Sequence, residues 1–281
     1  MKIILGLILA LLAPLTFTHA ETAAEKEAVY YSTLTEWHVP LGQVWSVLFK
    51  TEGDYHLPAK CDCVAADAVA SGLPFCGDVV AEADVQAKVY KYGGDGDGAI
   101  WTGTYLAMLA YKWTATGRSD AEVETQMLDA LSTVETLFAV SGQKGLLARS
   151  FAPPGSNISL DDGNGIHVNA DDAVAYPGYR WTGNISRDQY SGIIWGLYTI
   201  ERLVGDHLPG VRDRVTKLIV DFVTVLIDNG YKMPREEGKG SLSFKPILPG
   251  QAIYVLAYVR YALQLTGDSY FADAYSRLVS R

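Results

Sequence analysis

Two acidic loops in this chain each lead directly into an apolar stretch with helical spacing. Asp97 ends the run Gly-Gly-Asp-Gly-Asp, and Asp188 lies within Ser-Arg-Asp-Gln-Tyr. A pair of carboxyl groups is what the cleavage of a glycosidic bond requires, because such groups do acid/base or nucleophilic work. Asp97 and Asp188 are therefore the candidate catalytic residues. The simpler interpretation remains open: Asp97 is also a good helix N-cap, and Asp188 also complements a helix dipole.

Other side chains near these loops suit the binding of a sugar. Aromatic rings stack on the apolar faces of sugar rings, and Arg contacts polar or anionic sugar groups. The candidate substrate-binding residues are Trp101, Arg149, His167, Trp181, Arg187 and Tyr190. Each has a structural alternative; Arg149, for example, can pair with a surface acid such as Asp120. The sequence has no nucleophile elbow, phosphate loop or zinc-protease motif, and we expect neither a metal nor a cofactor. A Ca²⁺ loop at Asp95 and Asp97 is the weaker alternative, because the full twelve-residue EF-hand pattern is absent.

Three loop segments, 94–97, 186–189 and 248–251, each open a helical pattern. The predicted helices pair as 100–116 with 121–140, 190–204 with 211–227, and 252–265 with a last helix from Tyr270 onward. Gly117, Gly205 and Gly267 end the first helix of each pair, where a left-handed C-cap favours glycine. Ser119 and Glu122 have the spacing of a capping box. Short connections make antiparallel helical hairpins, and hairpins packed side by side would place the three opening loops on one face.

These hairpins predict a repeat architecture, either an open solenoid or a closed α/α toroid. The helices are apolar over broad faces, which favours an all-α toroid of helical hairpins. Because three hairpins are visible, either the ring is incomplete or the sequence is a fragment. The expected division is a signal peptide at 1–20, a loop-rich N-terminal lead-in at 21–97 packed on the main body, and the toroid domain at 98–281. The stretch 152–183 interrupts the hairpins, lacks periodicity, and is expected to form a wall or lid of the site.

The N-terminus resembles an export signal. Lys2 precedes an apolar run at 3–15, and Thr18-His19-Ala20 offers a cleavage site after Ala20. The run is shorter than the roughly 20 residues that a membrane span needs. We therefore expect a secreted or periplasmic protein without a membrane anchor after cleavage. A formal charge of −9 disfavours nucleic acid as a partner.

The three cysteines, Cys61, Cys63 and Cys76, lie close together in the sequence. In an oxidising compartment the expected outcome is a local disulfide. Cys76 can pair with either of the other two, which leaves one thiol over. A thiolate metal site is the weaker alternative, because no histidine lies at a suitable spacing.

Three runs together resemble the six-hairpin glycosidase-like superfamily: 96–107, 145–149 and 186–192. The resemblance implies an α/α toroid with its active site where the inner helices begin. Members include glycoside hydrolases acting on unsaturated uronyl sugars, sugar epimerases and, on related toroids, polysaccharide lyases. Asp97 and Asp188 match the loop-borne acids of such proteins by their position in the repeat. This chain shows three hairpins rather than six, and its third opening loop has no carboxylate.

Three functional hypotheses follow. The first is an exported carbohydrate-active enzyme, a glycoside hydrolase that uses Asp97 and Asp188. The second is a polysaccharide lyase, in which Tyr190 or His167 is the base and an arginine neutralises a uronate. The third is a non-catalytic glycan-binding or interaction module. The partner in each case is a carbohydrate substrate or glycan, and the sequence fixes no oligomeric state.

Overall fold

The computed structural model describes residues 39–49, 89–93, 95–156, 158, 160, 165–236, 238–246 and 249–280. The chain divides into two compact units, 1–33 with 56–79 and 34–55 with 80–281, and every described residue belongs to the second. The predicted signal peptide, most of the lead-in and the three cysteines lie outside the described residues. Within these ranges, no helix is both long and apolar enough to cross a membrane.

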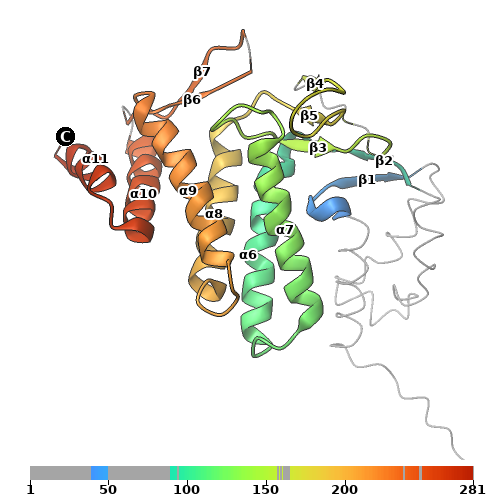
Figure 1. Ribbon diagram of the computed structural model, residues 1–281, viewed down its shortest axis with the longest axis horizontal. Helices are drawn as coiled ribbons and strands as arrows, with labels where there is room; N and C mark the ends of the chain where they lie inside the picture. The colour runs from blue at the N-terminus through green and yellow to red at the C-terminus, as the bar shows by residue number, and fades with distance from the viewer. Residues whose placement is uncertain are drawn as a thin grey trace, which may run out of the picture. The chain divides into compact units, whose positions relative to one another are not determined.

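Three helical hairpins make up most of the described chain (Figure 1). Their helices are α6 (Gly98–Ala115) with α7 (Ala121–Ala139), α8 (Arg187–Val204) with α9 (Val211–Asp228), and α10 (Pro249–Thr266) with α11 (Ser269–Val279). Two short 3-10 turns, η2 (Pro40–Gly42) and η4 (Asp95–Asp97), precede them. The two helices of each hairpin pack on one another, and α8 also contacts α6 and α10. These helices lie within a few residues of the predicted ranges.

The helix ends follow the sequence with two exceptions. Gly117 and Gly267 adopt left-handed φ values of 71° and 66°, as a glycine C-cap requires. Gly205 remains right-handed at φ −54°, and the chain turns only after it. The predicted capping box at Ser119 was wrong: the N-cap of α7 is Asp120, whose Oδ1 accepts a hydrogen bond from the Val123 N–H at 3.1 Å.

Short antiparallel strands fill the segments before and between the hairpins. β1 (Ser46–Phe49) pairs with β2 (Val89–Gly93), and β6 (Lys232–Pro234) pairs with β7 (Ser241–Ser243). β5 (Arg180–Thr182) lies between β3 (Ser150–Ala152) and β4 (Ile166–Val168). The predicted all-α toroid is therefore wrong: the described chain combines helical hairpins with small sheets and does not form an all-α toroid.

The missed sheets have a physical explanation. A strand of three residues is too short to show the two-residue alternation that reveals a strand in a sequence. Ser150 faces Thr182 across β3 and β5, so the pairing joins residues far apart in the chain. Between them lies the stretch rich in Gly, Asp, Asn and Pro that was predicted to be a loop.

α6 and α8 meet backbone to backbone. A methyl group on Gly103 would overlap the carbonyl of Gly192, and one on Gly192 would lie 2.6 Å from the Cα of Ile100. Gly196 in turn lies against the backbone of Gly103. Because contacts advance in the same direction along both helices, α6 and α8 are parallel and begin at the same end. We call this contact the glycine seam.

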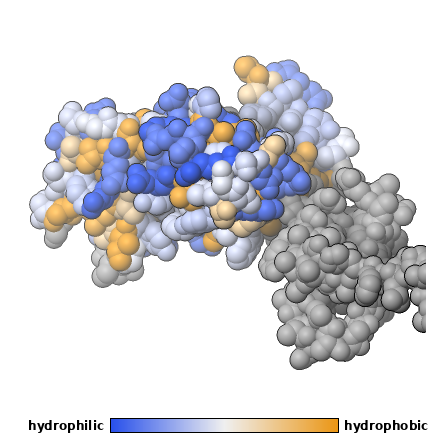
Figure 2. All heavy atoms as spheres, turned by 90° about the horizontal axis from the view of Figure 1, so that it is seen from below, coloured by the Kyte–Doolittle hydropathy of each residue, from blue (hydrophilic) through white to orange (hydrophobic). Residues whose placement is uncertain are grey.

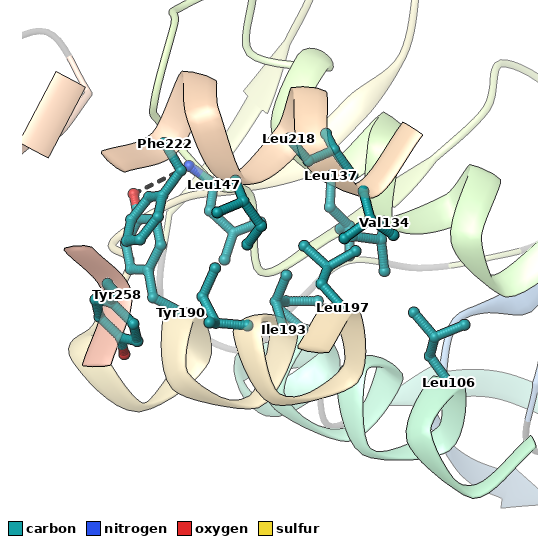
Figure 3. Close-up of a cluster of buried hydrophobic side chains, with 14 of the residues drawn as sticks. Leu106, Val134, Leu137, Leu147, Tyr190, Ile193, Leu197, Leu218, Phe222 and Tyr258 are labelled. Carbon is teal, nitrogen blue, oxygen red and sulfur yellow. Dashed lines mark hydrogen bonds between the residues drawn. The ribbon is translucent and has the colours of Figure 1, made fainter. Parts of the chain in front are cut away.

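The hydrophobic core lies beneath the glycine seam, where α8 faces α7 and α9. Figure 3 shows Tyr190, Ile193 and Leu197 of α8 directed toward Phe222 and Leu218 of α9. The Tyr190 and Phe222 rings stack with centroids 5.2 Å apart. Burial of each such side chain contributes about 1.5–3 kcal/mol. By contrast, Figure 2 shows mostly hydrophilic residues over the coloured surface seen from below, with hydrophobic ones in separate small groups.

Candidate active site

The glycine seam brings the loops before α6 and α8 to the same place, which we call the mouth. Gln189, on the first turn of α8, is buried and joins the two loops. Its Nε2 donates to the Asp97 Oδ1 at 3.0 Å, and its Oε1 accepts from the Ile100 N–H at 2.9 Å. One amide side chain thereby fixes the start of α6 and the carboxylate of Asp97 relative to α8.

Arg149 approaches the mouth from the loop before β3. Its Nε and Nη2 donate to the carbonyl oxygen of Asn184 at 3.0 and 2.8 Å, and its Nη1 donates to the carbonyl of Gly96. Nη1 also lies 3.9 Å from the Asp97 Oδ1, and Nη2 donates to the Ser186 Oγ at 3.3 Å. The guanidinium therefore ties the loops together and places a positive charge beside Asp97. It lies where a substrate contact was predicted, but its donors are used within the protein.

Asp188 is connected to this arginine through Ser186. The Ser186 hydroxyl donates to the Asp188 Oδ1, so that Arg149 and Ser186 connect the two candidate acids. Both carboxylates face solvent, and the Asp97 side chain is 62% exposed. Asp97 occupies the N-cap position of α6 but makes no side-chain cap bond, and the same holds for Ser186 on α8. Both predicted acids thus lie at the mouth with their carboxylates accessible.

The predicted stacking residues separate into one exposed and two buried rings. Trp101 lies one turn after Asp97 and is 53% exposed, so it is available to a ligand at the mouth. Tyr190 is fully buried, and its hydroxyl donates to the Gly145 carbonyl at 2.8 Å. The same hydroxyl accepts from the Leu147 N–H at 3.2 Å (Figure 3). Burial raises the pKa of Tyr190 above its ordinary value. Tyr190 supports the mouth from beneath and presents no surface to a ligand.

Trp181 is also buried, in the central strand β5. Its Nε1 donates to the Asn169 Oδ1 at 3.1 Å, and its ring stacks on half-buried His167 with centroids 4.2 Å apart. Arg187 is half-buried, and its Nη1 donates to the Ser243 carbonyl at 2.8 Å. These predicted ligand contacts brace the sheet and the start of α8.

Sequence reasoning missed a group from the β6–β7 hairpin that supports the mouth. Glu236 is buried, and its Oε1 accepts from the backbone N–H of Asn184. Arg235 donates from Nη2 to the Asn184 Oδ1 at 3.2 Å and to the Ile185 carbonyl at 3.1 Å. Asn184, with a left-handed φ of 53°, thus links this hairpin to Arg149. Arg235 and Glu236 lie in a loop, where the sequence has no periodicity that could have revealed their contacts with Asn184.

Among the described residues, no group of three or more His, Cys, Asp or Glu side chains could hold a metal ion. Comparisons with protein-family models, with curated proteins and with solved structures found no match to this chain. Any function of the mouth must therefore be inferred from its geometry. Two accessible carboxylates, a half-buried cation and an exposed indole ring are available there.

Proposed function

We propose that this protein is an exported carbohydrate-active enzyme that hydrolyses glycosidic bonds with Asp97 and Asp188. The observation that carries the proposal is the placement of both accessible carboxylates at the mouth, joined through Arg149 and Ser186. Hydrolysis of a glycosidic bond needs one carboxyl group to protonate the leaving oxygen and another to act as base or nucleophile. Two parallel helices that begin together can supply such a pair to one bound sugar.

Neighbouring groups support this chemistry in distinct ways. Gln189 and Arg149 hold Asp97 at a fixed position, which helps because misplaced catalytic groups lose rate steeply. Trp101 offers an exposed ring one turn from Asp97, where the apolar face of a sugar can stack. Export is proposed from the sequence: Lys2, the apolar run at 3–15 and the small residues before Ala20 form a signal-peptide pattern.

A non-catalytic glycan-binding module is the second candidate, and one observation favours it. Each carboxylate already accepts a hydrogen bond from the protein, Asp97 from Gln189 and Asp188 from Ser186. Carboxylates held in this way can have a purely structural role, which is to stabilise the loops of the mouth. The lyase hypothesis has less support, because the Tyr190 hydroxyl is buried and bonded to backbone, and His167 is stacked on Trp181.

The test is the release of reducing sugar from a glycan panel by the full-length protein and its Asp97→Asn, Asp188→Asn and doubly substituted variants. Each single change is expected to lower kcat by about 10²–10⁴-fold, the usual contribution of acid/base catalysis. Asp213→Asn is the control, because this exposed acid lies in the first turn of α9, which runs antiparallel to α8. Unchanged turnover in all three mouth variants would overturn the proposal, and glycan binding by the wild type without any turnover would establish the binding module instead.

A further inference from the structure

A groove with a volume of about 490 Å³ runs between α8 and α10. This volume falls within the roughly 300–1,000 Å³ of sites that bind small molecules. The groove residues that matter here are Trp195, Tyr198, Tyr254, Tyr258, Arg260 and Tyr261. None of them belongs to the mouth, and none is among the site residues that were predicted from the sequence.

Two buried tyrosines form the floor of this groove and set its width. The Tyr258 hydroxyl lies 2.9 Å from the Ser191 Oγ, and the Tyr261 hydroxyl donates to the Leu197 carbonyl at 3.2 Å. Both bonds cross from α10 to α8. The walls are exposed aromatic residues, with Trp195 on α8 at 49% and Tyr254 on α10 at 44% exposure.

One pair of rings on each of the two helices is close to parallel. Trp195 and Tyr198 have an interplanar angle of 27°, and Tyr254 and Tyr258 have one of 28°. Flat apolar faces with hydroxyl groups at their edges match a pyranose ring, which has C–H faces and a rim of hydroxyls. Interfaces between proteins are also enriched in Tyr, Trp and Arg. A charged sugar chain is favoured here by Arg260, which is unpaired among the described residues, and by the continuity of the groove with the mouth.

Arg260 gives the groove a charge preference. Its guanidinium is exposed, and within the described ranges it takes part in no hydrogen bond or ion pair. The planar fork of arginine matches a carboxylate or sulfate in a bidentate manner. In a chain with a formal charge of −9, an unpaired cation among aromatic rings favours an anionic ligand.

The groove also continues from the mouth. Asp188, Ser191, Trp195 and Tyr198 follow one another at helical spacing along the accessible face of α8. Ser191 at the head of the groove is therefore one turn beyond the candidate acid. A chain bound at the mouth can extend along this face.

We propose that this groove binds further units of an anionic polysaccharide, with sugar faces on Trp195 and Tyr254 and a carboxylate or sulfate on Arg260. Cleavage of the bound chain rests on the proposed function, whereas binding of the chain in the groove does not depend on it. The groove thereby makes the protein selective for long, charged chains over short or neutral ones.

The experiment measures calorimetric affinity of the full-length Asp97→Asn/Asp188→Asn protein for polygalacturonate, chondroitin sulfate and neutral dextran. Trp195→Ala is expected to weaken binding of the anionic chain at least tenfold, and Arg260→Gln is expected to abolish the preference over dextran. Tyr111→Ala is the matched control, because Tyr111 is an exposed aromatic residue on α6 outside the groove. It is expected to bind as the parent does.

Several outcomes separate this inference from the proposed function. If hydrolysis depends on chain length in the same way in the wild type and in Trp195→Ala, the proposal that the groove binds glycan is wrong. The proposed hydrolase function is then unaffected. If Trp195→Ala weakens glycan binding but the wild type cleaves no glycan, the groove binds glycan and the proposed hydrolase function is wrong. Equal affinity of the parent protein for dextran and the anionic chains overturns the role of Arg260. A wild-type oligomer that Trp195→Ala converts to a monomer, without any glycan binding, shows an interface between copies and overturns the proposal.

Discussion

The helix α8 meets its two neighbours in opposite ways. Toward α6 it presents Gly192 and Gly196, and the backbones touch along the glycine seam. Toward α10 it presents Trp195 and Tyr198, and a groove of about 490 Å³ remains between the helices. The difference teaches that side-chain size on two faces of one helix decides whether neighbouring helices pack backbone to backbone or leave a groove between them.

The largest effect is expected from filling the glycine seam. Gly103→Ala would place a methyl group on the Gly192 carbonyl, so that α6 and α8 must separate. We expect a loss of unfolding free energy on the order of 3 kcal/mol, the upper part of the usual range for overpacking. Chemical denaturation measures it. Gly250→Ala is the control, because the added methyl group meets no atom within 4 Å among the described residues beyond its own turn of helix. This change should be neutral or stabilise by up to about 1 kcal/mol. Equal denaturation midpoints for wild type and Gly103→Ala would show that the seam is not tight.

The next effect concerns the tyrosine beneath the seam. Tyr190→Phe leaves the Leu147 N–H and the Gly145 carbonyl without their buried partner, which is expected to cost about 1–3 kcal/mol. Tyr254→Phe on the groove wall removes a hydroxyl from a partly exposed ring and should change stability by under about 0.5 kcal/mol. Thermal and denaturant unfolding measure the free energy of unfolding of the two variants. Similar losses in both variants would contradict the distinction between a supporting ring and a ligand-facing ring.

The smallest effect at neutral pH is expected at the groove floor. Burial raises the pKa of Tyr258 from 10.0 to about 12, against a smaller lowering by its hydrogen bond with Ser191. Because the folded pKa lies above the unfolded value, Tyr258 contributes stability that is complete below pH 10 and is lost as pH rises toward 12. Tyr258→Phe should cost about 1 kcal/mol at pH 7 and make the alkaline loss of stability shallower. Unfolding free energies measured from pH 7 to 12 test this, and an unchanged slope in the variant would contradict it.

The sequence was sufficient for the hairpins and for the position of the two acids. Apolar spacing and the stops at Gly117 and Gly267 predicted the helices, and the loops that open the hairpins were expected to share a face. The mouth confirms this for Asp97 and Asp188, because α6 and α8 are parallel. Whether these acids are catalytic stays a prediction.

Other features could not be predicted, for physical reasons. Tyr190 was expected to line the site, yet on a helix that is apolar over most of its surface, periodicity does not tell a core ring from a ligand-facing one. The same ambiguity hid Trp195 and Tyr254, which look like core residues in the sequence. The sheets and the support from Glu236 depend on pairings between distant segments, for which the sequence carries no local signal.

The glycine seam also has a mechanical consequence. Because α6 and α8 are in contact through their backbones, they are expected to move as one body, and the separation of Asp97 from Asp188 is fixed with them. α10 packs on α9 and α11, and it is joined to α8 across the groove by the Tyr258 and Tyr261 hydroxyls. The width of the groove therefore depends on side chains, whereas the approach of α6 to α8 is set by their backbones. Close backbone packing and an open groove thus lie on two neighbouring faces of a single helix.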